Sequence, residues 1–454
     1  MVVTPFYFRQ RRVQLLFTVL VILAFFLLLN SFQNLSFTRL SVKVPEEYNE
    51  KEPGSFVKYV YPFPSNDSYC RFNYALPKQF TFDKWDLTGT PEFDIDSSFV
   101  VLYNVIQSTF TDTQPFVTYA TQLTRDFAVY VTEVVRYWEG PISIAAYIPD
   151  GNPQAILQQF LQFCYCIPEM SKVSLHLVFK KEIEDVINSF NFELYVPPAN
   201  CDIQSFVKLV SGQTLSNNNS VKTKSSDNDS WYPINVGRNV ARQAAFTDYV
   251  MVCDVELMPS HDLASRFMQM LDVEKCTSTE CEKQVYVVPV FEVEASETVP
   301  RTKNQLISLL NQEKAVYFHR KICTHCQKFP GLERWMDSDS GDVIRPLLVT
   351  KREAPYHRWE PIYIGTKNEP LYHEKLSWEG FQDKMLQMLE MCLMNYKLVV
   401  LDGAFLVHWP GMKKVKVKHD SSRQRFKDMN QRQYNLLLKN MTARYPPNPQ
   451  CRIK

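Results

Sequence analysis

The sequence predicts an α/β protein with a largely parallel sheet. Apolar runs of strand length at Phe99–Tyr103, Ile142–Tyr147 and Val173–Phe179 alternate with helical stretches, as in strands connected by helices. The 454 residues are 45% hydrophobic and 22% charged, which is a globular composition and enough for one large domain or two smaller ones. A net charge of +1 gives no reason to expect a nucleic acid as partner.

The other elements follow from local pattern. A polar stretch rich in Ser and Asn, Ser211–Ser230, is expected to be an exposed loop. Beyond Lys413 the chain is basic and predicted to be helical up to Ala443. The remaining expected elements, in order, are a helix at Thr121–Trp138, a strand at Phe192–Val196, a helix at Asn235–Phe246, strands at Tyr249–Cys253 and Val285–Val293, an amphipathic helix at Trp378–Asn395, and strands at Leu398–Leu401 and Ala404–Val407.

An apolar segment near the N-terminus predicts a membrane anchor. Residues 13–29 are apolar except for Gln14 and Thr18, and three arginines lie just before them. The segment is short for a membrane span but within the usual range. The polar residues Asn30 to Asn34 make a poor cleavage site, so a retained signal-anchor is favoured over a cleaved signal. The preceding arginines predict a single-pass type II protein whose body is lumenal or extracellular.

Sequons and cysteines agree with a lumenal body. The sequons are Asn34, Asn66, Asn218, Asn228 and Asn440. All 11 cysteines also follow the anchor, in a compartment where disulfides persist. Because 11 is odd, at least one thiol is free or paired with another chain, and Cys253 is the candidate for the free one. The resulting division is a cytosolic tail (1–12), the transmembrane signal-anchor (13–29), a proline-containing stem (30–95) and a lumenal domain (96–454).

Two carboxylates end the most apolar strand. Tyr249–Cys253 reads as a strand buried on both faces, and Asp254 and Glu256 follow it directly. Ligands of open α/β sheets bind outside the carboxyl ends of strands, and carboxylates there suit Mn²⁺ or Mg²⁺. A helix is expected to follow, with Ser260 as its N-cap, and the alternative interpretation of the two carboxylates is an acidic turn between the strand and that helix.

Other polar residues have two interpretations each. His408, at the end of an apolar strand, is a third metal ligand or a packed histidine. Arg238 and Asn239, at a predicted helix start, hold a sugar or phosphate or are simply solvated. Carboxylates between Leu371 and Lys384 include a possible base for a sugar hydroxyl, although surface acids are the simpler explanation.

Four cysteines invite comparison with a zinc site. Cys323 and Cys326 flank His325, and Cys276 and Cys281 lie five residues apart. Structural zinc needs four ligands, and no second pair at the usual spacing accompanies the first. Disulfides are therefore favoured for all four cysteines.

Taken together, the motifs resemble those of the LARGE-type glycosyltransferases, family 49, and within them the animal β-1,4-glucuronyltransferase branch. The resemblance covers roughly Phe99 to Cys451 and keeps the family's order and approximate spacing. The motifs are Thr118-Tyr119-Ala120-Thr121, Tyr232-Pro233-Ile234-Asn235 with Arg238-Asn239, Asp254-Val255-Glu256, Cys323-Thr324-His325-Cys326-Gln327, Trp359-Glu360-Pro361-Ile362-Tyr363, and Phe405-Leu406-Val407-His408.

The resemblance implies a GT-A type, Rossmann-like nucleotide-sugar-binding domain in a Golgi type II membrane protein. It implies Mn²⁺ held by Asp254, Glu256 and His408, where the family's usual second acid is Asp rather than Glu. The donor implied is UDP-glucuronate, and the acceptor implied is a glycan or glycoprotein with a xyloside-type terminus. Cofactor-binding residues implied by the shared motifs are Arg238, Asn239, Thr121 and Asn235.

The inverting chemistry of the family implies one carboxylate base, for which Asp383 and Glu379 are the expectations. Lys384 is a candidate partner for a glucuronate carboxyl group, or else a surface lysine. The rival functions are the same fold with another donor, such as UDP-N-acetylglucosamine, and an inactive relative that binds a glycan. A homo-oligomer and a complex with another glycosyltransferase are both left open by the sequence.

Overall fold

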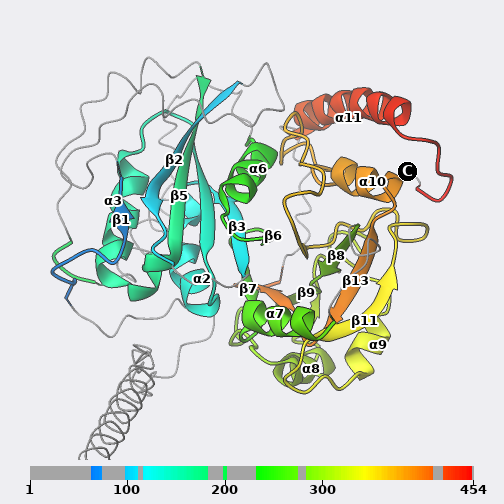
Figure 1. The fold of residues 1–454 in the computed structure, drawn as a ribbon, viewed down its shortest axis with the longest axis horizontal. Helices are drawn as coiled ribbons and strands as arrows, with labels where there is room; N and C mark the ends of the chain where they lie inside the picture. Colours follow the sequence, from blue (N-terminus) through cyan, green and yellow to red (C-terminus); the bar gives the residue numbers. More distant parts are fainter. Residues whose placement is uncertain are drawn as a thin grey trace, which may run out of the picture. The chain divides into compact units, whose positions relative to one another are not determined.

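The computed structural model describes residues 63–73, 98–110, 116–181, 198–201, 232–274, 283–412 and 423–451, all of which belong to one compact unit, Glu52–Lys454. These residues form two sheets with helices packed around them (Figure 1). The larger sheet has ten strands in the spatial order β1 (Arg71–Phe72), β2 (Phe99–Gln107), β5 (Val173–Lys180), β4 (Ile142–Ile148), β3 (Val117–Leu123), β6 (Tyr249–Val252), β12 (Tyr363–Gly365), β8 (Gln284–Val287), β13 (Lys397–Asp402) and β11 (Arg345–Thr350).

The large sheet is mixed, so the expectation of a largely parallel sheet is wrong. Strands β5, β4, β3 and β6 form a parallel block, and β8 and β13 pair in parallel, while β12 and the strands at both edges are antiparallel. The parallel block contains strands that are buried at almost every position, which explains why their sequences are continuously apolar.

A smaller, four-stranded sheet lies beside the end of β6. Its strands are ordered β10 (Ala315–Tyr317), β9 (Val290–Val293), β14 (Leu406–His408) and β7 (Leu257–Pro259). Strand β14 pairs with β7 so that His408 lies opposite Leu257. This register brings the end of the chain's last predicted strand next to the loop that follows β6.

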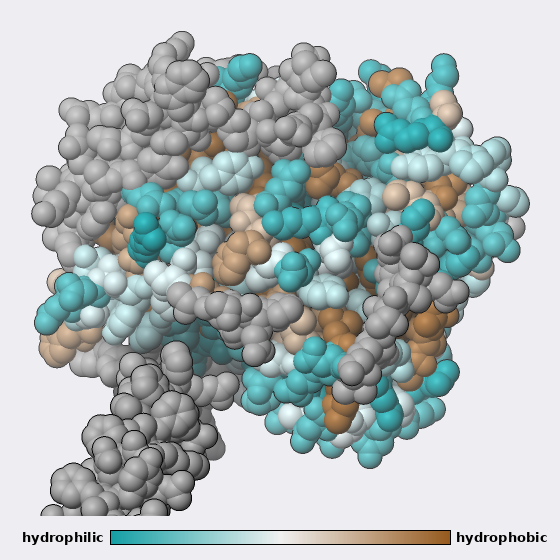
Figure 2. Space-filling view, viewed as in Figure 1, coloured by the Kyte–Doolittle hydropathy of each residue, from teal (hydrophilic) through white to brown (hydrophobic). Residues whose placement is uncertain are grey.

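The helices surround the two sheets. They are α2 (Val131–Tyr137), α3 (Gln154–Cys166), α6 (Ile234–Ala244), α7 (Leu263–Glu274), α8 (Lys303–Asn311), α9 (Leu332–Asp337), α10 (Met385–Leu393) and α11 (Gln424–Arg444), with 3-10 turns η2 (Arg125–Tyr130) and η3 (Pro168–Lys172). Helix α6 packs on β3 and β4, and α10 and α11 lie side by side over their own apolar cluster (Figure 1). On the face shown in Figure 2, hydrophilic side chains predominate and hydrophobic ones form small separate groups.

Four elements differ from their predicted form. The stretch predicted as one helix from Thr121 is strand β3 up to Leu123, followed by η2 and α2. The predicted strand Val285–Val293 is two strands, β8 and β9, which belong to different sheets. The predicted helix from Trp378 begins only at Met385.

The fourth difference concerns Ser260, which does not cap a helix. Its backbone N–H donates to the Phe405 carbonyl at 2.9 Å, and its hydroxyl oxygen lies 3.3 Å from the Phe405 N–H, so it extends the β7–β14 pairing. Helix α7 begins three residues later, at Leu263.

The cysteine predictions are confirmed where the structure describes them. Cys323 is bonded to Cys326, and Cys253 is free and buried. Three further disulfides join Cys70 to Cys164, Cys166 to Cys201 and Cys392 to Cys451. Cys276 and Cys281, the strand predicted at Phe192–Val196 and the loop Ser211–Ser230 lie outside the described residues.

The predicted anchor at residues 13–29 also lies outside the described residues. Among the residues that are described, no helix combines the length and the apolar character that crossing a membrane requires.

Candidate active site

The site is built where the parallel strands β3 and β6 end. Beyond β6 the backbone turns through Cys253 to Glu256 before β7 begins. The buried hydroxyl of Tyr119, on β3, lies 2.9 Å from the carbonyl oxygens of both Asp254 and Leu257. Since these two carbonyls bracket the turn, Tyr119 holds the segment that carries Asp254 and Glu256.

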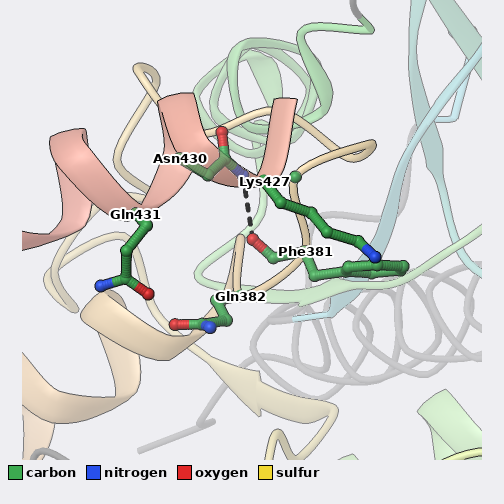
Figure 3. A pocket seen from close by; sticks show the side chains of 6 residues that line it. Phe381, Gln382, Lys427, Asn430 and Gln431 are labelled. Carbon is green, nitrogen blue, oxygen red and sulfur yellow. Dashed lines mark hydrogen bonds between the residues drawn. The ribbon is translucent and has the colours of Figure 1, made fainter. Parts of the chain in front are cut away.

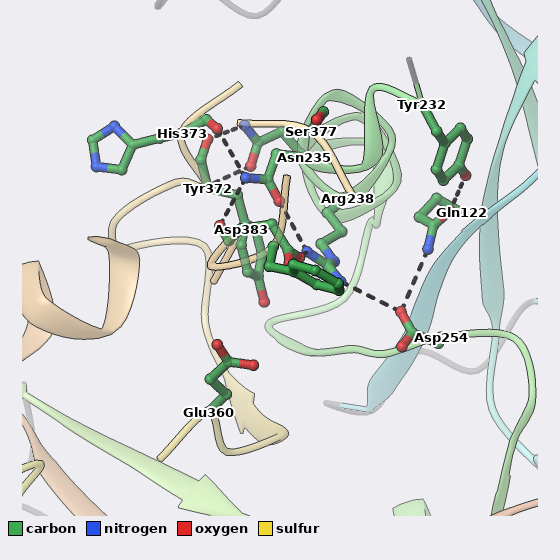
Figure 4. A network of polar contacts seen from close by, with 12 residues as sticks. Gln122, Tyr232, Asn235, Arg238, Asp254, Glu360, Tyr372, His373, Ser377 and Asp383 are labelled. Atoms are coloured by element: carbon green, nitrogen blue, oxygen red, sulfur yellow. Dashed lines mark hydrogen bonds and ion pairs between the residues drawn. The ribbon is translucent and has the colours of Figure 1, made fainter. Parts of the chain in front are cut away.

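Asp254 lies between an arginine and a glutamine (Figure 4). Its Oδ1 is 3.5 Å from Nη2 of Arg238 and accepts a hydrogen bond from Nε2 of Gln122 at 3.4 Å. The hydroxyl of Tyr232 donates to Oε1 of Gln122, which fixes the orientation of that amide. The Asp254 side chain keeps 29% of its surface exposed, so it remains open to a ligand.

Arg238 connects three segments of the chain. Its Nη1 donates to Oδ2 of Asp383 and, at 2.9 Å, to Oδ1 of Asn235 one helical turn earlier in α6. Burial alone would lower the pKa of the Arg238 guanidinium, but the charges of Asp383 and Asp254 raise it above its ordinary value. The guanidinium is therefore a permanent cation, held between two carboxylates.

The predicted residues Asn235 and Asn239 tie α6 to the segment that follows residue 370. Asn235 donates to the carbonyls of His373 (2.8 Å) and Asp383 (2.9 Å). Asn239 donates to the Tyr372 carbonyl at 2.8 Å and accepts from the Tyr372 N–H at 3.0 Å. Both amides thus hold the backbone of the site, and both are almost completely buried.

Glu256 and His408 form a second polar pair. His408 Nε2 lies 3.8 Å from Glu256 Oε1, and His408 Nδ1 lies 3.0 Å from the carbonyl oxygen of Gly411. A carbonyl only accepts, so Nδ1 carries the proton and Nε2 presents a lone pair. That Nε2 is buried and makes no hydrogen bond to any residue the structure describes, which is the condition of an imidazole prepared to ligate a metal.

The donor set fits a hard divalent cation such as Mn²⁺. It offers carboxylate oxygens from Asp254 and Glu256 and an imidazole nitrogen whose other nitrogen is fixed by a backbone carbonyl. The ligand atoms of these three side chains are farther apart than those of a closed metal site. In the described part of the chain, the only three such side chains with ligand atoms within 4.8 Å of one another are Cys323, His325 and Cys326, where the disulfide occupies both sulfurs.

The other predicted residues lie around this centre. Thr121, on β3, is fully buried, and its hydroxyl has no hydrogen-bond partner in the described part of the chain. Both carboxylate oxygens of Glu379 lie 3.1 Å from the Tyr232 N–H and accept from it. The two acids expected to act as a base, Glu379 and Asp383, are therefore both engaged in holding the site together, since Asp383 is paired with Arg238.

Sequence reasoning gave no role to Glu360. In Figure 4 its carboxylate points toward the network around Arg238 and Asp383. Burial and the negative charge of Asp383 raise the pKa of Glu360 to about 7, while Lys384, Arg238 and Arg352 oppose the rise. The only sequence signal was its place inside the Trp359–Tyr363 motif, which says nothing about its environment.

Comparisons with known proteins show the family of the chain. A family model described as a glycosyl-transferase for dystroglycan matches residues 116–446. Beta-1,4-glucuronyltransferase 1 of Mus musculus is 28% identical over 338 residues, which are 73% of this chain and 76% of that protein. The protein of the same name from Danio rerio is 26% identical over 378 residues, 81% of this chain and 84% of its own length.

More distant matches cover smaller parts of their proteins. The xylosyl- and glucuronyltransferase LARGE1 of Homo sapiens is 22% identical over 330 residues, which are 72% of this chain but 34% of LARGE1. A crystal structure of GalNAc-T7 with UDP, GalNAc and Mn²⁺ overlaps 75% of this chain and 60% of its own, with 7% identity and a TM-score of 0.33. The family predicted from the motifs is confirmed: the chain belongs to the glycosyl-transferase family for dystroglycan, and it is a glycosyltransferase.

Proposed function

We propose that the protein transfers glucuronate from UDP-glucuronate to a glycan acceptor, on a GT-A type domain that works with Mn²⁺. The observation that carries the proposal is the pair of Glu256 and His408 beside Asp254, at the carboxyl end of a parallel strand. When bound there, Mn²⁺ neutralises the charge that develops on the UDP leaving group. The named glucuronyltransferase relatives support the choice of sugar.

Lys384 supports an acidic donor sugar. Its ammonium group makes no hydrogen bond or ion pair in the described part of the chain, and its charge acts on the nearby Glu360. An uncommitted cation in a site already rich in carboxylates suits the carboxylate of a uronate. We therefore assign Lys384 to recognition of the glucuronate carboxyl group.

We assign the base to Glu360 ahead of Asp383 and Glu379. Asp383 is paired with Arg238 and Glu379 accepts from Tyr232, so both are committed, whereas no hydrogen bond to the Glu360 side chain is seen among the described residues. Glu360 accepts the proton of the acceptor hydroxyl, whose oxygen bonds to the anomeric carbon while the bond from that carbon to the diphosphate oxygen breaks. A pKa of about 7 suits such a transfer near neutral pH.

The first test is UDP release by the purified protein across a panel of UDP-sugars, with and without Mn²⁺. We expect turnover with UDP-glucuronate and Mn²⁺, and a loss of about 100-fold in Asp254→Ala and in His408→Ala. Turnover with UDP-N-acetylglucosamine instead would keep the enzyme class and change the donor. Full activity in both variants would refute the metal assignment, and glycan binding without any turnover would favour the inactive relative.

A second test addresses donor recognition. Lys384→Met is expected to raise the Kd for UDP-glucuronate about tenfold or more and to leave the Kd for UDP-glucose unchanged, since only the uronate has a carboxylate for Lys384 to contact. Lys375→Met, an exposed lysine nine residues earlier, is the matched control. Equal effects of Lys384→Met on the two donors would refute the assignment.

We further propose that residues 13–29 anchor the protein in the Golgi membrane with its body in the lumen. Two sequons in the described residues, Asn66 and Asn440, are exposed, as an attached glycan requires. Removal of N-glycans with a glycosidase should increase the gel mobility of the protein from cells, and protease added to intact vesicles should leave the body uncut. Cleavage in intact vesicles would refute the orientation.

A further inference from the structure

A pocket of about 130 Å³ lies between α11 and the segment that precedes α10 (Figure 3). We call it the α11 pocket. Its lining comes from Lys427, Asn430 and Gln431 of α11 and from Gly380, Phe381 and Gln382. In Figure 3 the amides of Gln382 and Gln431 face each other across it, and the Lys427 side chain runs along the Phe381 ring.

The pocket has a rigid wall. Asn430 is 2% exposed and donates to the carbonyls of Ser377 (2.8 Å) and Phe381 (2.9 Å), while its Oδ1 accepts from the Ser377 N–H at 3.1 Å. A Cβ on Gly380 would lie 2.2 Å from Cγ of Asn430, so the backbone passes as close to α11 as a glycine allows. The segment is thereby fixed to the helix.

The backbone at the pocket is also strained. Phe381 and Gln382 have φ angles of 60° and 61°, in the left-handed region that non-glycine residues seldom enter. Two such residues in succession cost free energy and persist only where the surroundings enforce them, which is typical of functional segments. The result here is that the Phe381 side chain is turned outward to solvent.

Two exposed aromatic side chains, Phe381 in the pocket lining and Trp378, share a contact with the Arg423 guanidinium beside the pocket. Trp378 is 49% exposed and Phe381 47% exposed. The guanidinium carbon of Arg423 lies 4.3 Å from the Trp378 ring centroid and 4.6 Å from that of Phe381. Flat aromatic faces beside amide groups match a pyranose ring, which is apolar on its faces and hydroxylated at its edge.

The two cations beside the pocket, Arg423 and Lys427, have no counter-ion among the described residues. In the described residues neither Arg423 nor Lys427 makes an ion pair or a hydrogen bond, and Nη2 of Arg423 is buried without a partner. The ammonium of Lys427 instead lies 5.3 Å from the Phe381 ring centroid. Burying part of a guanidinium without an acceptor is unfavourable, so the arrangement favours an anionic ligand.

We propose that the α11 pocket is an acceptor subsite that binds a sugar unit carrying an anionic group: the ring lies against Phe381 and Trp378, and the anion is held by Arg423 and Lys427. The inference rests on the proposed transferase function. The segment that lines the pocket also carries Glu379 and Asp383, which contact the candidate active site, so the subsite lies next to that site along the chain.

The test is binding without nucleotide sugar or metal, measured by calorimetry on the whole protein. The probes are a glucuronate-terminated oligosaccharide, its carboxyl-reduced counterpart and an oligosaccharide of equal length that carries a sulfate but no uronate. We expect the reduced probe to bind about tenfold more weakly than the uronate, and Arg423→Gln and Lys427→Gln each to weaken uronate binding by a similar factor. Tighter binding of the sulfated probe would also support the site and would assign the anion as a sulfate.

Lys439→Ala, an exposed lysine farther along α11, is the control for net charge. Thermal unfolding curves that match those of the wild type show that a variant is folded. Equal affinity for the uronate and the reduced probe, or wild-type binding by both pocket variants, or no binding of any probe, would overturn the proposal. Because UDP release is measured separately, failure of the donor assay would refute the transferase function and leave this result unaffected.

Discussion

The strongest single perturbation suggested by the structure is Glu360→Gln. Burial and Asp383 raise the pKa of Glu360 from 4.5 to about 7. The folded state thus binds this proton more tightly than the unfolded state, so the associated stability is fully present below pH 4.5 and is lost as the pH rises through 7. This shift in pKa corresponds to a loss of roughly 3 kcal/mol of unfolding free energy at most. A protein with the neutral glutamine at this position would not undergo that loss.

The expected result is a difference that depends on pH. Relative to wild type, Glu360→Gln should gain on the order of 2–3 kcal/mol of unfolding free energy between pH 5 and pH 8, measured by urea denaturation across that range. Glu313→Gln, on an exposed turn, is the control for loss of one charge. A gain that is equal at pH 5 and pH 8 would show that the pKa of Glu360 is not raised.

Activity gives an independent readout of the same residue. If Glu360 is the base, wild-type kcat should fall as the pH drops below about 7, and Glu360→Gln should lose about 100-fold or more and no longer show that limb. Asp383→Asn is the comparison, because it removes the charge that pairs with Arg238. An unchanged pH limb in Glu360→Gln would mean that another group takes the proton.

Other predictions concern stability and reactivity. Lys303→Met should destabilise the fold by roughly 3 kcal/mol, because it removes the buried ammonium 2.7 Å from Oδ1 of the fully buried Asp402 and leaves only the half-exposed Arg345 as a charged partner; urea unfolding that loses less than about 1 kcal/mol would contradict this. Cys451→Ser opens the disulfide to Cys392 across 59 residues and should cost about 4 kcal/mol, read as a lower melting temperature; an unchanged temperature would count against it. Cys253 should resist iodoacetamide in the native state at pH 8, since burial raises the pKa of its thiol; peptide mapping that finds it labelled before unfolding would contradict this.

Strand β6 could be predicted from the sequence because both of its faces are buried. Tyr249–Cys253 is apolar at successive positions, and β6 is covered on both faces, with β3 and β12 as its neighbours in the sheet. The two carboxylates that follow the strand could be recognised for the same reason. Their relation to His408 could not, since it depends on the pairing of β14 with β7, two segments about 150 residues apart.

A proline and non-local strand pairing explain two wrong predictions of secondary structure. Val285–Val293 reads as one strand, but Pro289 has no N–H to continue a ladder, and the chain passes to the second sheet there. The apolar residues from Thr121 onward recur at helical spacing, yet Thr121 to Leu123 belong to strand β3 and pair with strand β4. Non-local pairing overrides a local pattern of this kind.

The prediction that the helix begins at Trp378 was wrong for a different reason. Trp378–Asn395 is amphipathic throughout, but its first seven residues are held in irregular structure by contacts from other elements. The side-chain amide of Asn430 donates hydrogen bonds to the carbonyls of Ser377 and Phe381, and that of Asn235 donates one to the carbonyl of Asp383. These bonds replace those of a helix, and they place Asp383 against Arg238.

Two motifs that looked unrelated in the sequence form one structural unit. The Cys326 carbonyl accepts from the Glu360 N–H at 2.9 Å, and Nε2 of Gln327 donates to the Glu360 carbonyl at 2.8 Å. The turn closed by the Cys323–Cys326 disulfide therefore fixes both backbone groups of the acid that we propose as the base. Cysteines that resembled half of a zinc site are better understood as the support of Glu360, because a base must be positioned as accurately as its pKa is set.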